Sequence, residues 1–262
     1  MKSHFTKYHG AGNDFILIDE MDGDWLDDRM IAKACCRRTG IGADGLVRLS
    51  VSHVADFKVT YYNADGALGS LCGNGSRCAV DFAKRSDLFS GSECSFEAVD
   101  GLHEAWWKGS DEVTIAMENI ALAKASVGGY FLDTGSPHHV FLLPESEDLG
   151  TLDVMELGKK LRYGYYVKQG GCNINWVQPI QGDNAYAIRT YERGVESETL
   201  SCGTGAVAAA LVIHQINRLP SPIQLEAKGG RLIIDFEGSD AGFKKIQLTG
   251  SVVQVYKGQW PW

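Results

Sequence analysis

Two segments with the pattern Cys-Gly-X-Gly lie 130 residues apart (202 minus 72) in a chain of 262 residues, so each half of the chain holds one of them. The segments span residues 72–75 (CGNG) and 202–205 (CGTG), and each leads into an apolar, alanine-containing stretch that predicts a helix. A repeat of this length is typical of a duplicated domain and not of a short-period solenoid. The sequence therefore predicts two lobes, each with one important helix that begins at its cysteine.

Runs that read as strands outnumber the helical stretches, which indicates a high sheet content. Strands are expected at residues 14–19, 45–50, 57–63, 94–99, 112–117, 138–143, 173–178, 186–192, 231–237 and 251–257. Helices are expected at residues 27–38, 73–88, 153–162 and 203–218. Because the last helix is apolar nearly all round, we expect a sheet curled around a central helix.

No linker rich in proline or serine separates the two halves, and the segment 119–129, which ends in two glycines, is the best candidate for a boundary. We expect an N-terminal lobe of residues 1–118, completed by residues 251–262, and a C-terminal lobe of residues 119–250. The expected fold class is α/β, in the α+β sense, with the active site in a cleft between the lobes.

Composition argues against several classes of function. The chain has 25 basic and 33 acidic residues, a formal net charge of −8 and no long cluster of Lys or Arg, so a nucleic-acid partner is not expected. The N-terminal segment carries charge and histidine where a secretory signal needs an apolar core, and no apolar run approaches membrane-spanning length. We therefore expect a cytoplasmic protein with no membrane partner.

The seven cysteines predict reduced thiols and not a disulfide framework. A free thiol packs as a small hydrophobic group, so a structural role is expected for Cys35, Cys36, Cys78, Cys94 and Cys172. The chain has no C-x₂-C pair and no local histidine cluster. No metal site is therefore expected.

Cys72 and Cys202 differ from the others because each stands where a glycine-rich turn becomes a helix start. Free backbone N–H groups and the helix dipole lower the pKa of a thiol at such a place and attract an anion. Two such thiols predict two-base chemistry without a cofactor, in which one removes a proton from a carbon acid as the other supplies its replacement. The amides suited to hold an anion at these helix starts are those of Gly73, Asn74, Gly203 and Thr204.

The residues alone leave two other interpretations open. A non-catalytic module would use the two helix starts to bind an anion and would keep both cysteines merely buried. Two facing thiols would also suit a disulfide that forms on oxidation. Thiol reactivity at neutral pH separates the first of these from an enzyme, because the enzyme needs at least one activated thiolate.

The motifs, taken in order, resemble the diaminopimelate epimerase family: HGAGNDF, GIGADGL, YNADG, LCGNGSRC, SPHHV, NINW, YERG, ETLSCGTGA and GGRL. The resemblance runs from residue 4 to about residue 255. It implies two pseudo-symmetric α/β lobes, a homodimer and a small diamino dicarboxylate substrate. The implied reaction is the cofactor-independent conversion of LL-diaminopimelate to meso-diaminopimelate, in the biosynthesis of lysine and of peptidoglycan precursors.

The resemblance also implies roles for single residues. Cys72 and Cys202 would be the catalytic thiols, each assisted by a proton acceptor, His138 for one and Glu192 for the other. Side-chain amides and a guanidinium suit a substrate with both amino and carboxylate groups. The residues implied to bind substrate are Asn13, Asn63, Asn173, Glu192 and Arg193, beside the four amides named above.

This chain departs from the family pattern at three places. Ser136 stands where many members have Asn, which puts that substrate contact in doubt. The loop after Arg193 is one residue longer than usual and lacks the second glycine, and Gly45 stands where some relatives carry Gln. These departures leave a racemase of another polar amino acid as the alternative function.

Overall fold

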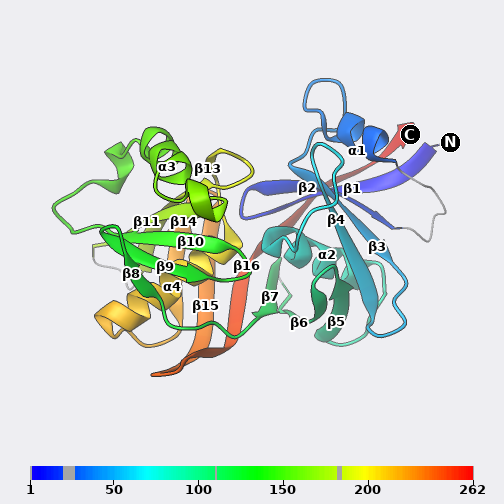
Figure 1. The fold of residues 1–262 in the computed structure, drawn as a ribbon. Coiled ribbons are helices and arrows are strands. Elements are labelled where there is room, and N and C mark those ends of the chain that lie inside the picture. The colour runs from blue at the N-terminus through cyan, green and yellow to red at the C-terminus, as the bar shows by residue number, and fades with distance from the viewer. Residues whose placement is uncertain (1, 20–26, 110, 182–184, 262) are drawn as a thin grey trace. The chain divides into compact units, whose positions relative to one another are not determined.

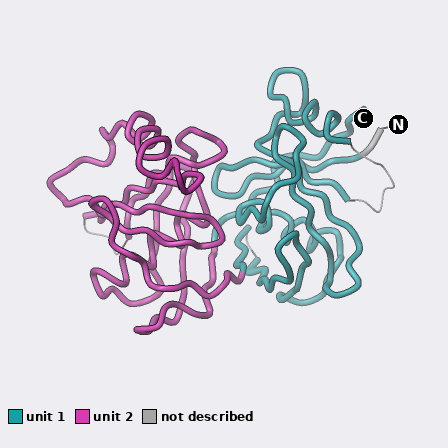
Figure 2. The backbone as a smooth tube through the Cα atoms, viewed as in Figure 1, with its two compact units in different colours: residues 1–115, 250–262 teal, residues 116–249 magenta. Residues whose placement is uncertain are grey.

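The structure is a computed structural model, and it describes residues 2–19, 27–109, 111–181 and 185–261. The chain divides into two compact units (Figure 2). Unit 1 comprises residues 1–115 together with 250–262, and unit 2 comprises residues 116–249. In the described ranges both units combine a sheet with two α-helices, which confirms the predicted two-lobed α/β fold.

Unit 1 is built on a sheet that curls until it closes on itself (Figure 1). Strands β1 to β7 are neighbours in sequence order, and the long strand β16 pairs with both β7 and β1. The pairs β2–β3 and β4–β5 are parallel. The bounds are β1 Lys2–Gly10, β2 Asn13–Asp19, β3 Gly45–Ser50, β4 Phe57–Asn63, β5 Glu93–Ala98, β6 Gly101–Trp107, β7 Glu112–Met117 and β16 Gly242–Pro261.

Helix α2 (Gly73–Arg85) is the central helix of unit 1. Every residue from position 74 to position 83 is buried, and the helix contacts β1, β2, β3, β4 and β6. Cys72 is its N-cap, with a sulfur that accepts a hydrogen bond from the Gly75 amide at 3.5 Å. Gly10 allows β1 to pass close by, because a Cβ at this position would lie 2.9 Å from the Asn74 carbonyl oxygen.

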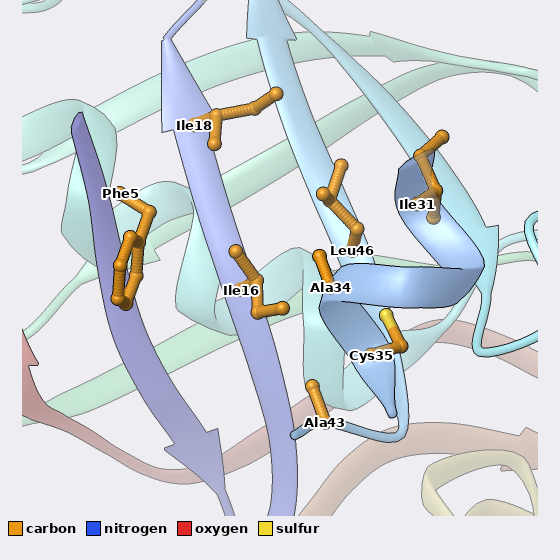
Figure 3. Close-up of a cluster of buried hydrophobic side chains, with 8 residues drawn as sticks. All are labelled: Phe5, Ile16, Ile18, Ile31, Ala34, Cys35, Ala43 and Leu46. Carbon is orange, nitrogen blue, oxygen red and sulfur yellow. The ribbon is translucent and has the colours of Figure 1, made fainter. Parts of the chain in front are cut away.

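The strands of unit 1 bury side chains on both faces. Phe15 of β2 lies near Gly75 of α2, whereas Ile16 and Ile18 belong to a cluster with α1 (Asp28–Cys35) on the other face. This double burial explains why β2 is a nearly continuous apolar run in sequence. The cluster, shown in Figure 3, contains Phe5, Ile16, Ile18, Ile31, Ala34, Cys35, Ala43 and Leu46.

Unit 2 has a sheet with the strand order β16, β15, β14, β12, β11, β10, β9 and β8, and β13 pairs with β12. The pairs β10–β11 and β12–β14 are parallel. The first part of β16, residues 242–249, belongs to this unit. The other bounds are β8 Lys124–Ser126, β9 Gly129–Asp133, β10 Pro137–Leu142, β11 Asn173–Pro179, β12 Ala185–Glu192, β13 Ser197–Thr199, β14 Ile223–Ala227 and β15 Gly230–Ser239.

Helix α4 (Gly203–Asn217) is the central helix of unit 2. All residues from position 205 to position 213 are buried, and the helix contacts β9, β10, β11, β14 and β15. The prediction of a sheet around this apolar helix is therefore confirmed. Helix α3 (Val154–Tyr163) contacts β11, β12 and β13, and two 3-10 turns, η2 (Leu149–Thr151) and η3 (Val167–Gln169), lie on either side of it in sequence.

Each predicted helix and strand has a counterpart in the structure, but several strands were not predicted. The unpredicted strands are β1, β6, β8, β9, β13 and β14. Every helix in the described ranges is either too short or too polar to cross a membrane.

Candidate active site

Cys72 lies at the start of α2 beside two of the residues implied to bind substrate. Its sulfur is 3.8 Å from Asn13 Oδ1, toward which the thiol donates. Asn74 Nδ2 donates to the same oxygen at 3.3 Å. The structure therefore brings Cys72, Asn13 and Asn74 together, although they come from two distant parts of the sequence.

Asp44 fixes the orientation of Asn13. Asn13 Nδ2 donates to Asp44 Oδ2 at 2.6 Å, so the amide oxygen of Asn13 is left to face Cys72 and Asn74. Arg37 in turn bridges Asp44 and Asp14, with Nη2 at 2.6 Å and 2.7 Å from their carboxylate oxygens. This role of the aspartate in the GADG segment was not predicted from the sequence.

A cavity of about 330 Å³ in unit 1 has Cys72 in its wall. Val47, Val59, Leu71 and Ser76 line it as well. Asn63, also implied to bind substrate, is exposed at the end of β4, where its backbone amide donates to the Ala67 carbonyl at 2.9 Å.

Cys202 begins α4 as Cys72 begins α2, and it lies beside Thr204. The sulfur of Cys202 is 3.6 Å from Thr204 Oγ1, and Thr204 Oγ1 is 3.0 Å from His138 Nε2. Gly205 permits this arrangement, because a Cβ there would lie 2.5 Å from Asn175 Oδ1 and 3.3 Å from the Cys202 sulfur. The second glycine of the motif is therefore a steric requirement in unit 2.

The hydrogen bonds around His138 define which ring nitrogen carries the proton. Asn175 accepts from Thr190 Oγ1 and donates to the His139 carbonyl, so its Nδ2 faces His138 Nδ1 at 3.1 Å as a donor. Nδ1 is then the acceptor, and the proton of the neutral ring is on Nε2. Asn173 Nδ2, which lies 3.4 Å from Nε2, directs its hydrogens to Ser136 Oγ and the Pro137 carbonyl instead. Consequently His138 donates to Thr204, and the Thr204 hydroxyl proton is free to point at the Cys202 sulfur.

Burial keeps His138 neutral. The side chain is fully buried, and burial together with the positive charge of Arg193 lowers its pKa to about 3. A ring with so low a pKa is a weak base at neutral pH. In the structure His138 is a hydrogen-bond donor to Thr204, and the expected role of His138 as a proton acceptor for a cysteine stays a prediction.

Asn173 connects the remaining predicted residues of unit 2. Its Oδ1 accepts from the Arg193 backbone amide at 2.8 Å, and its Nδ2 donates to Ser136 Oγ at 2.8 Å. The serine that replaces the usual asparagine is therefore a partner of Asn173. Glu192 is half-buried at the end of β12, and the Arg193 side chain beside it is exposed.

The longer loop after Arg193 is held in place by Glu196. This residue has a φ of 57°, and its carboxylate accepts from the Gly194 amide at 3.1 Å and from Arg162 Nε at 3.2 Å. The Glu196 side chain therefore connects this loop to α3 through Arg162.

The other cysteines divide into two groups. Cys35, Cys78, Cys94 and Cys172 are buried, and burial raises the pKa of each thiol, as expected for structural residues. The prediction for Cys36 was wrong, because this residue is exposed just after α1. A hydrogen bond from the Thr39 hydroxyl at 3.1 Å lowers the pKa of Cys36 to about 7. In the part of the chain that the structure describes, no group of acidic, histidine or cysteine side chains is arranged to hold a metal ion.

The profile of the diaminopimelate epimerase family matches residues 5–122 and 130–255 of this chain. The chain belongs to the diaminopimelate epimerase family. The diaminopimelate epimerase of Flavobacterium psychrophilum is 41% identical to it over 254 residues, which cover 96% of this chain and 97% of the relative. The diaminopimelate epimerase of Chlorobaculum tepidum is 39% identical over 257 residues, covering 95% and 98% of the two chains.

Solved structures outside the diaminopimelate epimerase family share the fold. A phenazine biosynthesis protein of Bacillus anthracis superposes with a TM-score of 0.76 at 13% identity, covering 100% of this chain and 99% of that one. A hydroxyproline epimerase of Agrobacterium vitis gives a TM-score of 0.72 at 15% identity, covering 99% and 91%. At these identities the likeness concerns the fold alone.

Proposed function

We propose that this protein converts LL-diaminopimelate to meso-diaminopimelate with Cys72 and Cys202 as its two acid–base groups. As a member of the diaminopimelate epimerase family, the protein is an isomerase that epimerises diaminopimelate, a small diamino dicarboxylate. The observation that carries the assignment of the thiols is their equivalent placement. Each is the N-cap of the buried central helix of its own unit.

The proposed reaction moves one proton off the α-carbon and another onto it. The thiolate of one cysteine takes the α-proton, and the thiol of the other donates its proton to the opposite face of the same carbon. The C–H electron pair remains on the carbon between these two events and forms the new bond. After one turnover the two cysteines have exchanged their protonation states. Proton exchange with solvent restores these states for the next turnover.

The first turns of α2 and α4 are suited to hold the substrate carboxylate while negative charge develops on the carbon. The backbone hydrogen bonds of the two helices begin with Ser76 N donating to Cys72 O and with Ala206 N donating to Cys202 O, so the amides of the preceding residues lie outside the helical pattern. The amides proposed to bind are those of Gly73, Asn74, Gly203 and Thr204. The proposed side-chain ligands are Asn13, Asn63, Asn173, Glu192 and Arg193.

Thr204 is proposed to support the thiolate of Cys202. Since His138 Nε2–H occupies a lone pair of the Thr204 oxygen, the hydroxyl proton is directed to the sulfur 3.6 Å away. A hydrogen bond to the charged form of a group favours that form. Glu192, which is half-buried at the end of β12, is proposed to assist proton transfer.

The biosynthesis of lysine is the context that the family gives to this reaction, and we extend the proposal to peptidoglycan precursors, a cytoplasmic location and a homodimer. The dimer is tested by sedimentation of the purified protein. A single species of the monomer mass of 28.6 kDa at micromolar concentration would contradict it.

The decisive experiment follows deuterium incorporation and stereochemistry when the reduced protein is incubated with LL-diaminopimelate in D₂O. We expect exchange with inversion at the α-carbon, and loss of turnover in Cys72→Ala and in Cys202→Ala. Cys36→Ala, which removes an exposed thiol after α1, is the matched control and should retain activity. Full turnover by either of the first two variants would overturn the assignment of the thiols.

A further inference from the structure

Arg77 is a buried cation that forms no ion pair with any carboxylate described in the structure. It lies on α2, its relative exposure is 0%, and it is the largest of the fully buried side chains. Its Nη2 donates to Asn74 Oδ1 at 2.6 Å. Among the residues that the structure describes, its Nε and Nη1 have no hydrogen-bond partner. Burial lowers the pKa of Arg77 to about 10, so the guanidinium is still charged at neutral pH.

A charge buried in this way is costly unless another charge compensates it. Two groups able to carry a negative charge, the thiols of Cys78 and Cys72, interact electrostatically with Arg77. Complete burial raises the pKa of Cys78, so that thiol is uncharged. Cys72, which is only partly buried, is the remaining candidate.

We propose that Arg77 is a positioning residue for Cys72, which it serves both by compensating the charge of the Cys72 thiolate and by orienting the side chains that hold the thiol. The inference rests on the proposed role of Cys72 as an acid–base group. It gives a function to an arginine that the two-thiol mechanism does not otherwise use.

The orienting part follows from consecutive hydrogen bonds. Arg77 donates to Asn74 Oδ1, which turns Asn74 Nδ2 toward Asn13 Oδ1. The same Asn13 oxygen accepts from the Cys72 thiol. The thiol form of Cys72 therefore has Asn13 as its partner, and the thiolate form has the Gly75 amide and the charge of Arg77. A residue that alternates between acid and base needs partners for both forms.

The carboxylates Asp81, Asp14 and Asp44 on and around α2 are bonded by groups other than Arg77. Asp81 of α2 is bonded by Arg85, by Tyr8 of β1 and by Trp107 of β6. On the other side, Lys7 of β1 and Arg37 bind Asp14 of β2, and Arg37 also binds Asp44. Arg48 of β3 lies 5.8 Å from the Tyr62 ring of β4. His9 of β1 is on the face of the strand opposite to Tyr8, by the alternation of side chains.

The test compares Arg77→Met, which keeps a long apolar stem and removes the charge, with Arg77→Lys, which keeps the charge and shortens the reach. Lys84→Met is the matched control, since it removes a positive charge from the last turn of the same helix. The measurement is the rate of iodoacetamide alkylation at each cysteine as a function of pH, resolved by peptide mass spectrometry. Cys36 serves as an internal reference in every sample because it is exposed and remote from Arg77 in sequence.

We expect Arg77→Met to move the midpoint of the Cys72 alkylation profile upward by a pH unit or more, which slows alkylation near neutral pH by about tenfold. Turnover should fall by a similar factor, with a smaller change in KM. Arg77→Lys should recover most of the profile, and Lys84→Met should leave it unchanged. The melting temperature of Arg77→Met should stay close to that of the parent, because the loss of the hydrogen bond to Asn74 Oδ1 offsets the removal of a costly buried charge.

Two failures can be told apart. If Cys72→Ala retains turnover, the proposed function of Cys72 fails. If Cys72→Ala is inactive while the Cys72 profile is the same in the parent and in folded Arg77→Met, the inference about Arg77 fails alone. If Arg77→Met does not fold, Arg77→Lys provides the test, because it keeps the positive charge. A shift of the Cys72 alkylation midpoint by a pH unit or more in Arg77→Lys would then overturn the proposal that Arg77 compensates the charge of the thiolate.

Discussion

His138 donates a hydrogen bond from Nε2 to the hydroxyl of Thr204, 3.0 Å away, at the point where Thr204 faces the sulfur of Cys202. The orientation of the ring is fixed by the Asn175 amide, which binds the other ring nitrogen, Nδ1. The imidazole is thus a fixed donor, and the group that meets the sulfur is a hydroxyl.

This relationship predicts the effect of two substitutions at Thr204. Thr204→Val keeps the volume and removes the hydroxyl, so the Cys202 thiolate loses a donor and turnover should fall by about 10- to 100-fold. Thr204→Ser keeps the hydroxyl and should stay within a few-fold of the parent. The checks are kcat with LL-diaminopimelate and the pH profile of Cys202 alkylation. Equal turnover in the valine and serine variants would show that the hydroxyl has no part in the reaction.

The low pKa of His138 predicts that stability depends on pH. The folded-state pKa is about 3 and the ordinary value is 6.5, so between these values the unfolded chain binds a proton that the folded chain does not. The contribution of neutral His138 is complete above pH 6.5 and is lost as the pH falls, by up to about 1.4 kcal/mol per pH unit. His139, whose pKa burial lowers to about 4, acts in the same direction.

Urea unfolding at about pH 7 and at about pH 5 measures this effect, because most carboxylates stay ionised over that interval. The free energy of unfolding should fall with pH in the parent and fall less steeply in His138→Asn. If the two proteins lose stability in parallel, His138 is not the group responsible.

The buried helices show how far the sequence could predict the site. Their N-caps, Cys72 and Cys202, stand out because glycine, an apolar run and the helix start coincide within a few residues. Strand β1 was not predicted because KSHFTKYHG carries charged and polar residues at positions that the fold pairs with β2 and β16. Its partner in β16 is about 250 residues away, and no local pattern contains that pairing.

The partners of the site residues were harder to predict than the residues themselves. Asp44 and Asn175 act through side chains whose neighbours come from other strands, so only the tertiary structure shows what they orient. Cys36 was assigned to packing because it continues an apolar helical pattern, but α1 ends at Cys35 and the next side chain points to solvent. The helix was predicted to end at residue 38, and α1 ends three residues earlier, so Cys36 lies outside the helix.

The two motif glycines should differ in their tolerance of alanine. A Cβ at Gly205 would lie 2.5 Å from Asn175 Oδ1, so Gly205→Ala must displace a hydrogen-bonded buried amide and should destabilise the protein by a few kcal/mol, about 1–3. A Cβ at Gly75 would meet its nearest neighbour, Val47 Cγ2, at 3.4 Å, an ordinary contact. Alanine also favours the helix, so Gly75→Ala should be neutral or stabilising by up to about 1 kcal/mol. Thermal unfolding of the two variants checks this, and equal losses would contradict the steric account.

The carboxylate of Asp44 predicts a defect in substrate binding. Asp44→Ala removes the acceptor that holds Asn13 Nδ2 at 2.6 Å, and the Asn13 amide becomes free to rotate away from Cys72. Because Asn13 is a proposed ligand as well as the partner of the Cys72 thiol, we expect KM to rise and kcat to fall, each by about three- to tenfold.

Arg37→Ala is the comparison that separates orientation from charge. Arg37 binds Asp44 and Asp14 but does not donate to Asn13 in any hydrogen bond of the described structure, so its removal leaves the Asp44–Asn13 bond in place. We expect a smaller kinetic effect than that of Asp44→Ala. If Arg37→Ala impaired turnover more severely than Asp44→Ala, the charge network around Asp14 would be the controlling feature. The orientation of Asn13 by Asp44 would then be incidental to catalysis.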